Sequence, residues 1–126
     1  MTLENQLTSL ELSENLRDLH VTQKSAFHWV LSKKGWNIHF GRTAKQILQM
    51  RLVGNEVISA FTVAELGEML KKSDYYLPYT NEDWTVWECR VGNTEDGEKQ
   101  YIQAKTEADC RAKMLIYLLE NKLITL

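Results

Sequence analysis

The strongest constraint on the fold is a pair of alternating segments joined by a short turn. Residues 27–31 and 36–40 each carry a large apolar residue at every second position, and this period of two is typical of β-strands. The connection 32–35 suits a tight hairpin, with glycine where the backbone needs unusual dihedrals. Folding about this turn pairs the apolar residues of the two strands: Leu31 with Trp36, Trp29 with Ile38 and Phe27 with Phe40. All of them then lie on one face of the hairpin, which we expect to be buried.

The same register places two histidines side by side on the opposite face. His28 pairs with His39, and directly opposed side chains have Cβ atoms about 5 Å apart. Both are candidate metal ligands, but two histidines do not make a zinc site, and the sequence does not place His20 close to them. We therefore predict no metal and no cofactor, with the histidine pair either solvated or covered by a helix.

Three amphipathic helices are predicted from the spacing of apolar residues and from start signals. The first begins near Thr8 or Ser9. Thr62 followed by Glu65 is a capping box and starts the second helix. Thr106 caps the last helix. The expected buried stripe of the last helix consists of Ala108, Ala112, Leu115, Leu119 and Leu123.

A second hairpin is predicted in the C-terminal half. Asp96-Gly97 is a strong turn dipeptide between two alternating segments. Folding about it pairs Val91 with Ile102 and Cys89 with Ala104. Pro78 makes the preceding stretch, 75–79, an edge strand or an extended loop.

Together these elements predict an α+β fold. The order is αββαββα, with an antiparallel sheet of two β-hairpins packed with helices, and the double ββα order leaves a pseudo-repeat open. The length of 126 residues favours a single domain over 1–126. Within it, segment 42–61 is ambiguous: Ala44, Ile47, Leu48 and Met50 could form a short helix, but Gly54-Asn55 interrupts the apolar pattern. We therefore expect this segment to be an irregular or mobile insert.

Two stretches resemble a known group of proteins. Residues 61–70 read FTVAELGEML and residues 106–120 read TEADCRAKMLIYLLE. They resemble small uncharacterised proteins carried by phages, prophages and mobile elements of gut Bacteroidetes. The Trp-bearing hairpin and the motif Thr-x-x-x-x-Arg-Ala-x-x-Leu also look like the phage domain described as an alpha-beta-alpha sandwich. This resemblance implies a fold and a genomic setting, and it carries over no catalytic residues.

The chain offers no membrane or export signal that we recognise. No basic residue precedes Arg17, and the longest apolar run, 114–119, is far shorter than the roughly 18 residues of a membrane span. We therefore expect a cytoplasmic protein with no membrane partner. In that compartment Cys89 and Cys110, which share no CxxC spacing, are expected to be small buried hydrophobes.

Charge is distributed unevenly along the chain. Between Leu19 and Asn55 there are six basic residues and no acidic one, whereas 1–18 carry a net −3 and 56–126 a net −5. The basic residues are Lys24, Lys33, Lys34, Arg42, Lys45 and Arg51. The last five are candidate phosphate contacts, with a nearby aromatic ring stacking on a base. The alternative is that the aromatic residues are core and the lysines keep the hairpin edge soluble.

The last helix presents a competing surface. Cys110, Met114, Tyr117 and Leu118 form a second apolar stripe beside the one expected to be buried. Self-association as a homodimer or binding of a protein partner would cover it, and so would the first helix of the same chain. Because motifs such as GxSxG and HExxH are absent, we predict a non-catalytic binding or adaptor protein acting through protein contacts, with nucleic-acid binding through 24–51 as the alternative.

Overall fold

The fold is known from a computed structural model, which describes residues 3–71, 75–80, 86–91 and 101–126. Within these residues the chain forms a 3₁₀ turn, four α-helices and six strands. In chain order they are η1 (Leu3–Gln6), α1 (Leu10–Asp18), β1 (Phe27–Ser32), β2 (Gly35–Phe40), α2 (Ala44–Leu52), β3 (Glu56–Ala60), α3 (Val63–Leu70), β4 (Tyr75–Thr80), β5 (Trp87–Val91), β6 (Tyr101–Ala104) and α4 (Glu107–Glu120).

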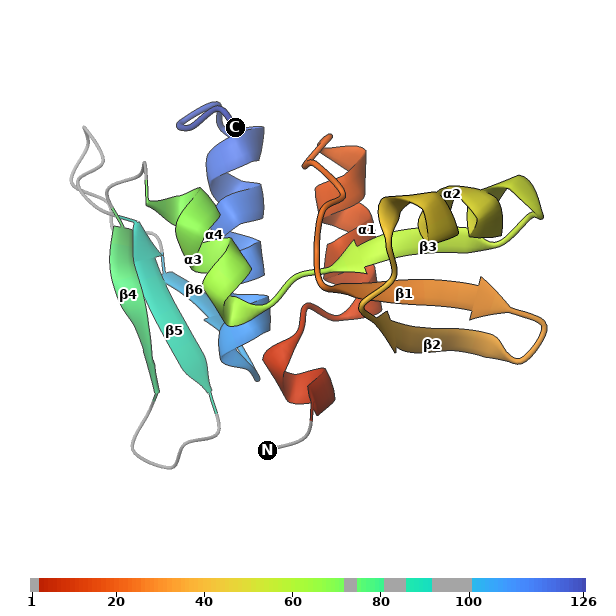
Figure 1. The fold of residues 1–126 in the computed structure, drawn as a ribbon. Coiled ribbons are helices and arrows are strands. Elements are labelled where there is room, and N and C mark those ends of the chain that lie inside the picture. The colour runs from red at the N-terminus through yellow and green to blue at the C-terminus, as the bar shows by residue number, and fades with distance from the viewer. Residues whose placement is uncertain (1–2, 72–74, 81–85, 92–100) are drawn as a thin grey trace.

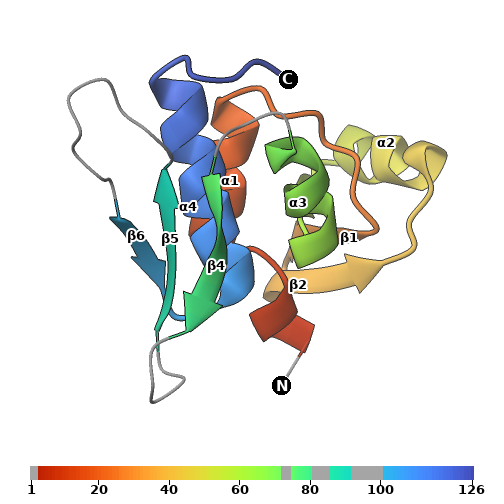
Figure 2. The ribbon, with the colours of Figure 1, turned by 90° about the vertical axis from the view of Figure 1, so that its left-hand side faces the viewer.

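The strands form two antiparallel sheets at opposite ends of the molecule (Figure 1). One sheet has the order β2-β1-β3 and the other β4-β5-β6. Helices α1, α3 and α4 lie between them, as the turned view also shows (Figure 2). The predicted α+β class is confirmed, but the two hairpins belong to separate sheets, because each recruits a third strand instead of pairing with the other hairpin.

The first hairpin has the predicted register. Phe27 pairs with Phe40, Trp29 with Ile38 and Leu31 with Trp36. Gly35 has a φ of +95°, which a residue with a side chain rarely adopts. The short turn and this glycine thus determine the pairing from local sequence alone.

The face expected to be buried is the more open face of this hairpin. Phe40 is 71% exposed, and Trp29 and Ile38 are only half-buried. His28 and Val30 on the other face are buried instead. The prediction was wrong because coverage comes from outside the hairpin: β3 and its neighbours bury the β1 centre, and β2 remains at the edge.

The segment predicted as an irregular insert is regular. It contains α2 and β3, the third strand of the first sheet. Thr43 and Gln46 form a capping box at the start of α2, and Gly54, with a φ of +94°, makes the turn into β3. The Gly54-Asn55 interruption therefore marks a boundary between two elements.

The second hairpin pairs two residues away from the predicted register. Cys89 pairs with Ile102 and Trp87 with Ala104. A shift of two preserves which side chains share a face, and the Asp96-Gly97 turn lies outside the described residues. The prediction of an edge strand at Pro78 is confirmed, because β4 is the outer strand of its sheet.

Helix α4 is central to the core. Ala108, Ala112 and Leu115 are buried as predicted, Leu119 is half-buried, and Leu123 is 55% exposed beyond the helix end. The second sheet packs against one side of α4, and α3 and α1 pack against others. The helix is therefore buried on more than one face.

Candidate functional site

One face of the first hairpin carries six large apolar side chains that the fold leaves partly or largely open. We call it the hairpin apolar face; it consists of Phe27, Trp29, Leu31, Trp36, Ile38 and Phe40. None of the six is buried. The ring centroids of Phe27 and Phe40 lie 4.9 Å apart, at the end of the hairpin away from its turn. This side of the sheet is covered towards β3, where Ile58 is fully buried, and uncovered towards β2.

The outer edge of β3 is closed by other parts of the chain. Arg51 Nη2 donates to the Val57 carbonyl at 3.0 Å, and the Ser59 amide donates to Gln23 Oε1 at 2.9 Å. Just beyond the strand, the amides of Thr8 and Phe61 donate to Phe61 O and Thr8 Oγ1, both at 2.9 Å. These contacts satisfy backbone groups that an edge strand otherwise exposes.

The outer edge of β2, at the other side of the sheet, is open. Only β1 pairs with β2 among the described residues. Cations flank this strand at both ends: Lys33 and Lys34 are exposed in the turn before it, and Arg42 and Lys45 are exposed after it. Four of the five predicted nucleic-acid contacts thus flank β2.

The fifth predicted contact, Arg51, lies near the other end of the helix that begins with Ala44 and Lys45. It is on α2, where it closes the edge of β3. The six cations therefore do not form one continuous patch: Lys33 and Lys34 lie at the hairpin turn, whereas Lys24, Arg42 and Arg51 line a cavity beside α2.

The two predicted histidines are paired across β1 and β2 as expected. Their surroundings differ, however. His39 Nδ1 accepts hydrogen bonds from Arg42 Nε and Nη2 at 3.2 and 3.1 Å. His28 is buried, and neither of its ring nitrogens has a hydrogen-bond partner. Among the described residues there is no group of three or more His, Cys, Asp or Glu that could hold a metal ion.

The apolar stripe predicted as a partner interface is covered inside the chain. Cys110, Met114 and Leu118 are buried and belong to the core, and Tyr117 is half-buried. The first helix, which the sequence left as the alternative cover, does pack against α4, but α3, β5 and β6 pack against this helix as well. The predicted interface at α4 required these side chains to be exposed, and three of the four are buried.

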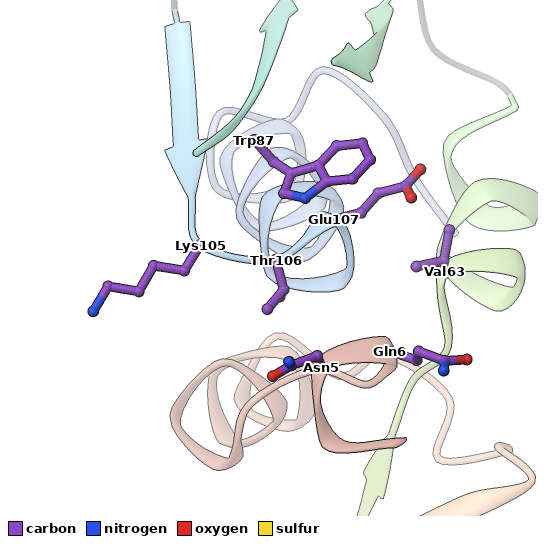
Figure 3. A pocket seen from close by; sticks show the side chains of 7 residues that line it. All are labelled: Asn5, Gln6, Val63, Trp87, Lys105, Thr106 and Glu107. Atoms are coloured by element: carbon purple, nitrogen blue, oxygen red, sulfur yellow. The ribbon is translucent and has the colours of Figure 1, made fainter. Parts of the chain in front are cut away.

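A cavity of about 210 Å³ lies where η1, α3 and the start of α4 meet (Figure 3). The Trp87 ring and the Glu107 carboxylate lie on one side of it, Asn5 and Gln6 lie on the opposite side, and Lys105 extends away from Trp87. Glu107 is already paired with Arg111 at 2.9 Å. Lys105 is the other charged residue of the lining, and it extends away from the Trp87 ring.

Sequence reasoning missed a second exposed apolar surface on α2. Leu48, Leu52 and Val53 are 57%, 76% and 77% exposed. The Thr43 capping box and the spacing of the two leucines were the available signals. The apolar spacing around Leu48 indicated a possible short helix, but the Gly54-Asn55 interruption led to the prediction of an irregular segment, and the Thr43 signal was not used.

No family model, curated protein or solved structure matches this chain. The resemblance to phage and mobile-element proteins therefore stays a prediction. Among the described residues, no helix has the length and apolar character needed to cross a bilayer.

Proposed function

We propose that this chain is a non-catalytic binding or adaptor protein of phage or mobile-element type, which binds an extended segment of a partner protein along β2. The observation that carries the proposal is the asymmetry of the first sheet. Its β3 edge is closed by Thr8, Gln23 and Arg51, whereas its β2 edge is open beside the hairpin apolar face.

An added strand would use both features of this edge. Backbone hydrogen bonds to β2 provide affinity, and alternate side chains of the added strand fall on the two faces of the sheet. On one face they meet Trp36, Ile38 and Phe40. Apolar side chains at every second position of the partner would cover these residues.

The charges favour an acidic partner. Lys33 and Lys34 precede β2, Arg42 follows it, and no acidic residue occurs between Leu19 and Asn55. The partner we propose is thus an extended protein segment in which apolar residues alternate with Asp or Glu. A second copy of this chain fits less well, because pairing two β2 edges antiparallel would bring Lys34 of one copy towards Arg42 of the other.

Nucleic acid is the competing ligand. Phe40 is 71% exposed and directly precedes Gly41 and Arg42, which is a suitable arrangement for stacking a base beside a phosphate. Such binding would be strongly salt-dependent and tolerant of sequence. The experiment below separates the two ligand classes.

The test uses the full chain with labelled amides and three probes. They are a peptide alternating apolar and acidic residues, a scrambled peptide of the same composition, and mixed-sequence single-stranded DNA. We expect the alternating peptide to bind more tightly than the scrambled one and to shift the amide signals of β2. Equal binding of both peptides would contradict strand addition, and binding of DNA alone would establish the nucleic-acid alternative.

A matched pair of variants locates the site. Phe40→Ser removes an exposed ring from the hairpin apolar face, and Leu52→Ser removes an equally exposed apolar side chain from α2. Phe40→Ser should weaken binding of the alternating peptide by about ten- to a hundredfold, since burying a phenylalanine contributes roughly 1.5–3 kcal/mol. Leu52→Ser should leave the affinity unchanged. Equal losses would contradict binding at β2.

A further inference from the structure

A second cavity, of about 360 Å³, lies between α2, β1 and the segment before β1. Ser25 and Lys24 line it from that segment, His28 from β1, and Ala44 and Arg51 from α2. It is large enough for a small ligand. No residue of α2 is buried, and Ala44, Ile47 and Arg51 of this helix line the cavity.

An unpartnered histidine faces this cavity. His28 is 1% exposed, and its Nδ1 and Nε2 have no hydrogen-bond partner. Ser59, its pairing partner on β3, is also buried, and its Oγ has no partner either. Buried polar atoms without partners are costly and rare in native proteins. A polar ligand in the cavity would satisfy the imidazole.

The charges lining the cavity favour an anion. Lys24, Arg42 and Arg51 line it, and no acidic residue does among those described. Arg51 uses one nitrogen for the Val57 carbonyl and keeps further N–H donors. Ala44 is the first residue of α2, a helix of nine residues, so the positive end of the helix dipole lies at the same place.

One carboxylate acts on His28 from outside the lining. Glu65 interacts electrostatically with the ring, but its oxygens accept hydrogen bonds from Ser25 Oγ and the Thr62 amide at 2.8 and 2.9 Å. It is therefore occupied at the start of α3. The Glu65 carboxylate therefore does not neutralise the three cations that line the cavity.

We infer that this cavity binds a phosphate group. Guanidinium, ammonium, imidazole and helix N-terminal groups together match a compact, multiply charged oxyanion better than a single carboxylate. The inference shares Arg42 with the charges that flank β2, but it does not depend on strand addition there. Either a small phosphomonoester or the terminal phosphate of a nucleic acid could supply the group.

The test follows the imidazole signals of His28 and the amide signal of Ala44 by NMR. The probes are inorganic phosphate, a sugar monophosphate, and one oligonucleotide with and without its 5′-phosphate, at constant ionic strength. We expect inorganic phosphate to shift both signals. Tighter binding of the sugar monophosphate identifies a small ligand, and tighter binding of the 5′-phosphorylated oligonucleotide identifies a nucleic-acid end. If phosphate shifts neither signal, the inference is wrong.

Variants distinguish specific binding of phosphate in the cavity from non-specific electrostatic attraction to surface cations. Lys24→Ala with Arg42→Ala removes two lining cations from exposed positions, and Lys33→Ala removes an exposed cation that does not line the cavity. The double variant should weaken phosphate binding at least about tenfold, because charge-assisted hydrogen bonds are lost. Lys33→Ala and Phe40→Ser should leave it unchanged. An equal loss with Lys33→Ala would overturn the site.

Discussion

Cys89 Sγ and Cys110 Sγ lie 3.0 Å apart in the core, joining the middle strand of the second sheet to α4. Both cysteines are free and fully buried. The hydrogen bond to Cys110 and burial hold the pKa of the Cys89 thiol well above its ordinary value. At neutral pH this thiol stays protonated and is a poor nucleophile.

We predict that both native thiols resist alkylation because both side chains are fully buried, although the pair can be oxidised slowly. The hydrogen bond with Cys89 lowers the pKa of Cys110, so burial is what protects this second thiol. A disulfide has an S–S distance of about 2.05 Å, so the sulfurs must approach by about 1 Å. Diamide should take up two hydrogens from the two thiols as the intramolecular disulfide forms. Mass spectrometry after alkylation in denaturant measures how many thiols have been lost to the disulfide. The Cys89→Ala variant is the control, and rapid alkylation of both native thiols would contradict the prediction.

A second prediction concerns the stability of the fold in acid. Burial lowers the pKa of His28 below its ordinary value of 6.5, Arg51 and His39 lower it further, and Glu65 opposes them. The unfolded chain therefore binds a proton at this residue more readily than the folded chain. Neutral His28 therefore contributes to the free energy of unfolding. This contribution is fully present above about pH 6.5 and is lost as the pH falls through the folded-state pKa.

The variant His28→Gln should flatten this dependence. Urea unfolding between about pH 7 and pH 5, in a buffer without phosphate, measures the loss of stability in each protein. We expect a smaller loss in the variant than in the wild type, whatever its stability at neutral pH. Parallel curves would show that His28 does not titrate on unfolding.

A third prediction compares two helix caps with the same local chemistry. Thr62 and Thr43 each form a capping box, at α3 and α2. Helix α3 buries Leu66 and Leu70, whereas α2 buries none of its residues. Thr62→Ala should lower the free energy of unfolding by about 1 kcal/mol.

Thr43→Ala should leave global unfolding almost unchanged, because α2 can open by itself. Its effect should be faster amide hydrogen exchange within α2. Urea unfolding and hydrogen exchange of both variants check the comparison. Equal losses in the free energy of unfolding would show that α2 unfolds together with the core.

Local sequence determined the features that depend on neighbouring residues. The first hairpin follows from a short turn ending at Gly35 and from strict alternation, so its register was predictable. The caps at Thr62 and Thr106 each depend on a residue three positions later. For Thr43 the same signal was present but was not used.

The tertiary structure decided which faces are covered. Alternation places Trp29 and His28 on opposite faces of β1. Only the placement of β3 and α2 makes the His28 side chain more buried than the Trp29 side chain. Likewise, α4 buries Ala108, Ala112 and Leu115 of its predicted stripe and also Cys110, Met114 and Leu118, because the second sheet and two helices pack around it. The closed β3 edge, the His28 cavity and the Cys89–Cys110 contact all bring together segments that are separated in sequence. Periodicity records which residues share a face, whereas burial depends on what else in the chain packs there.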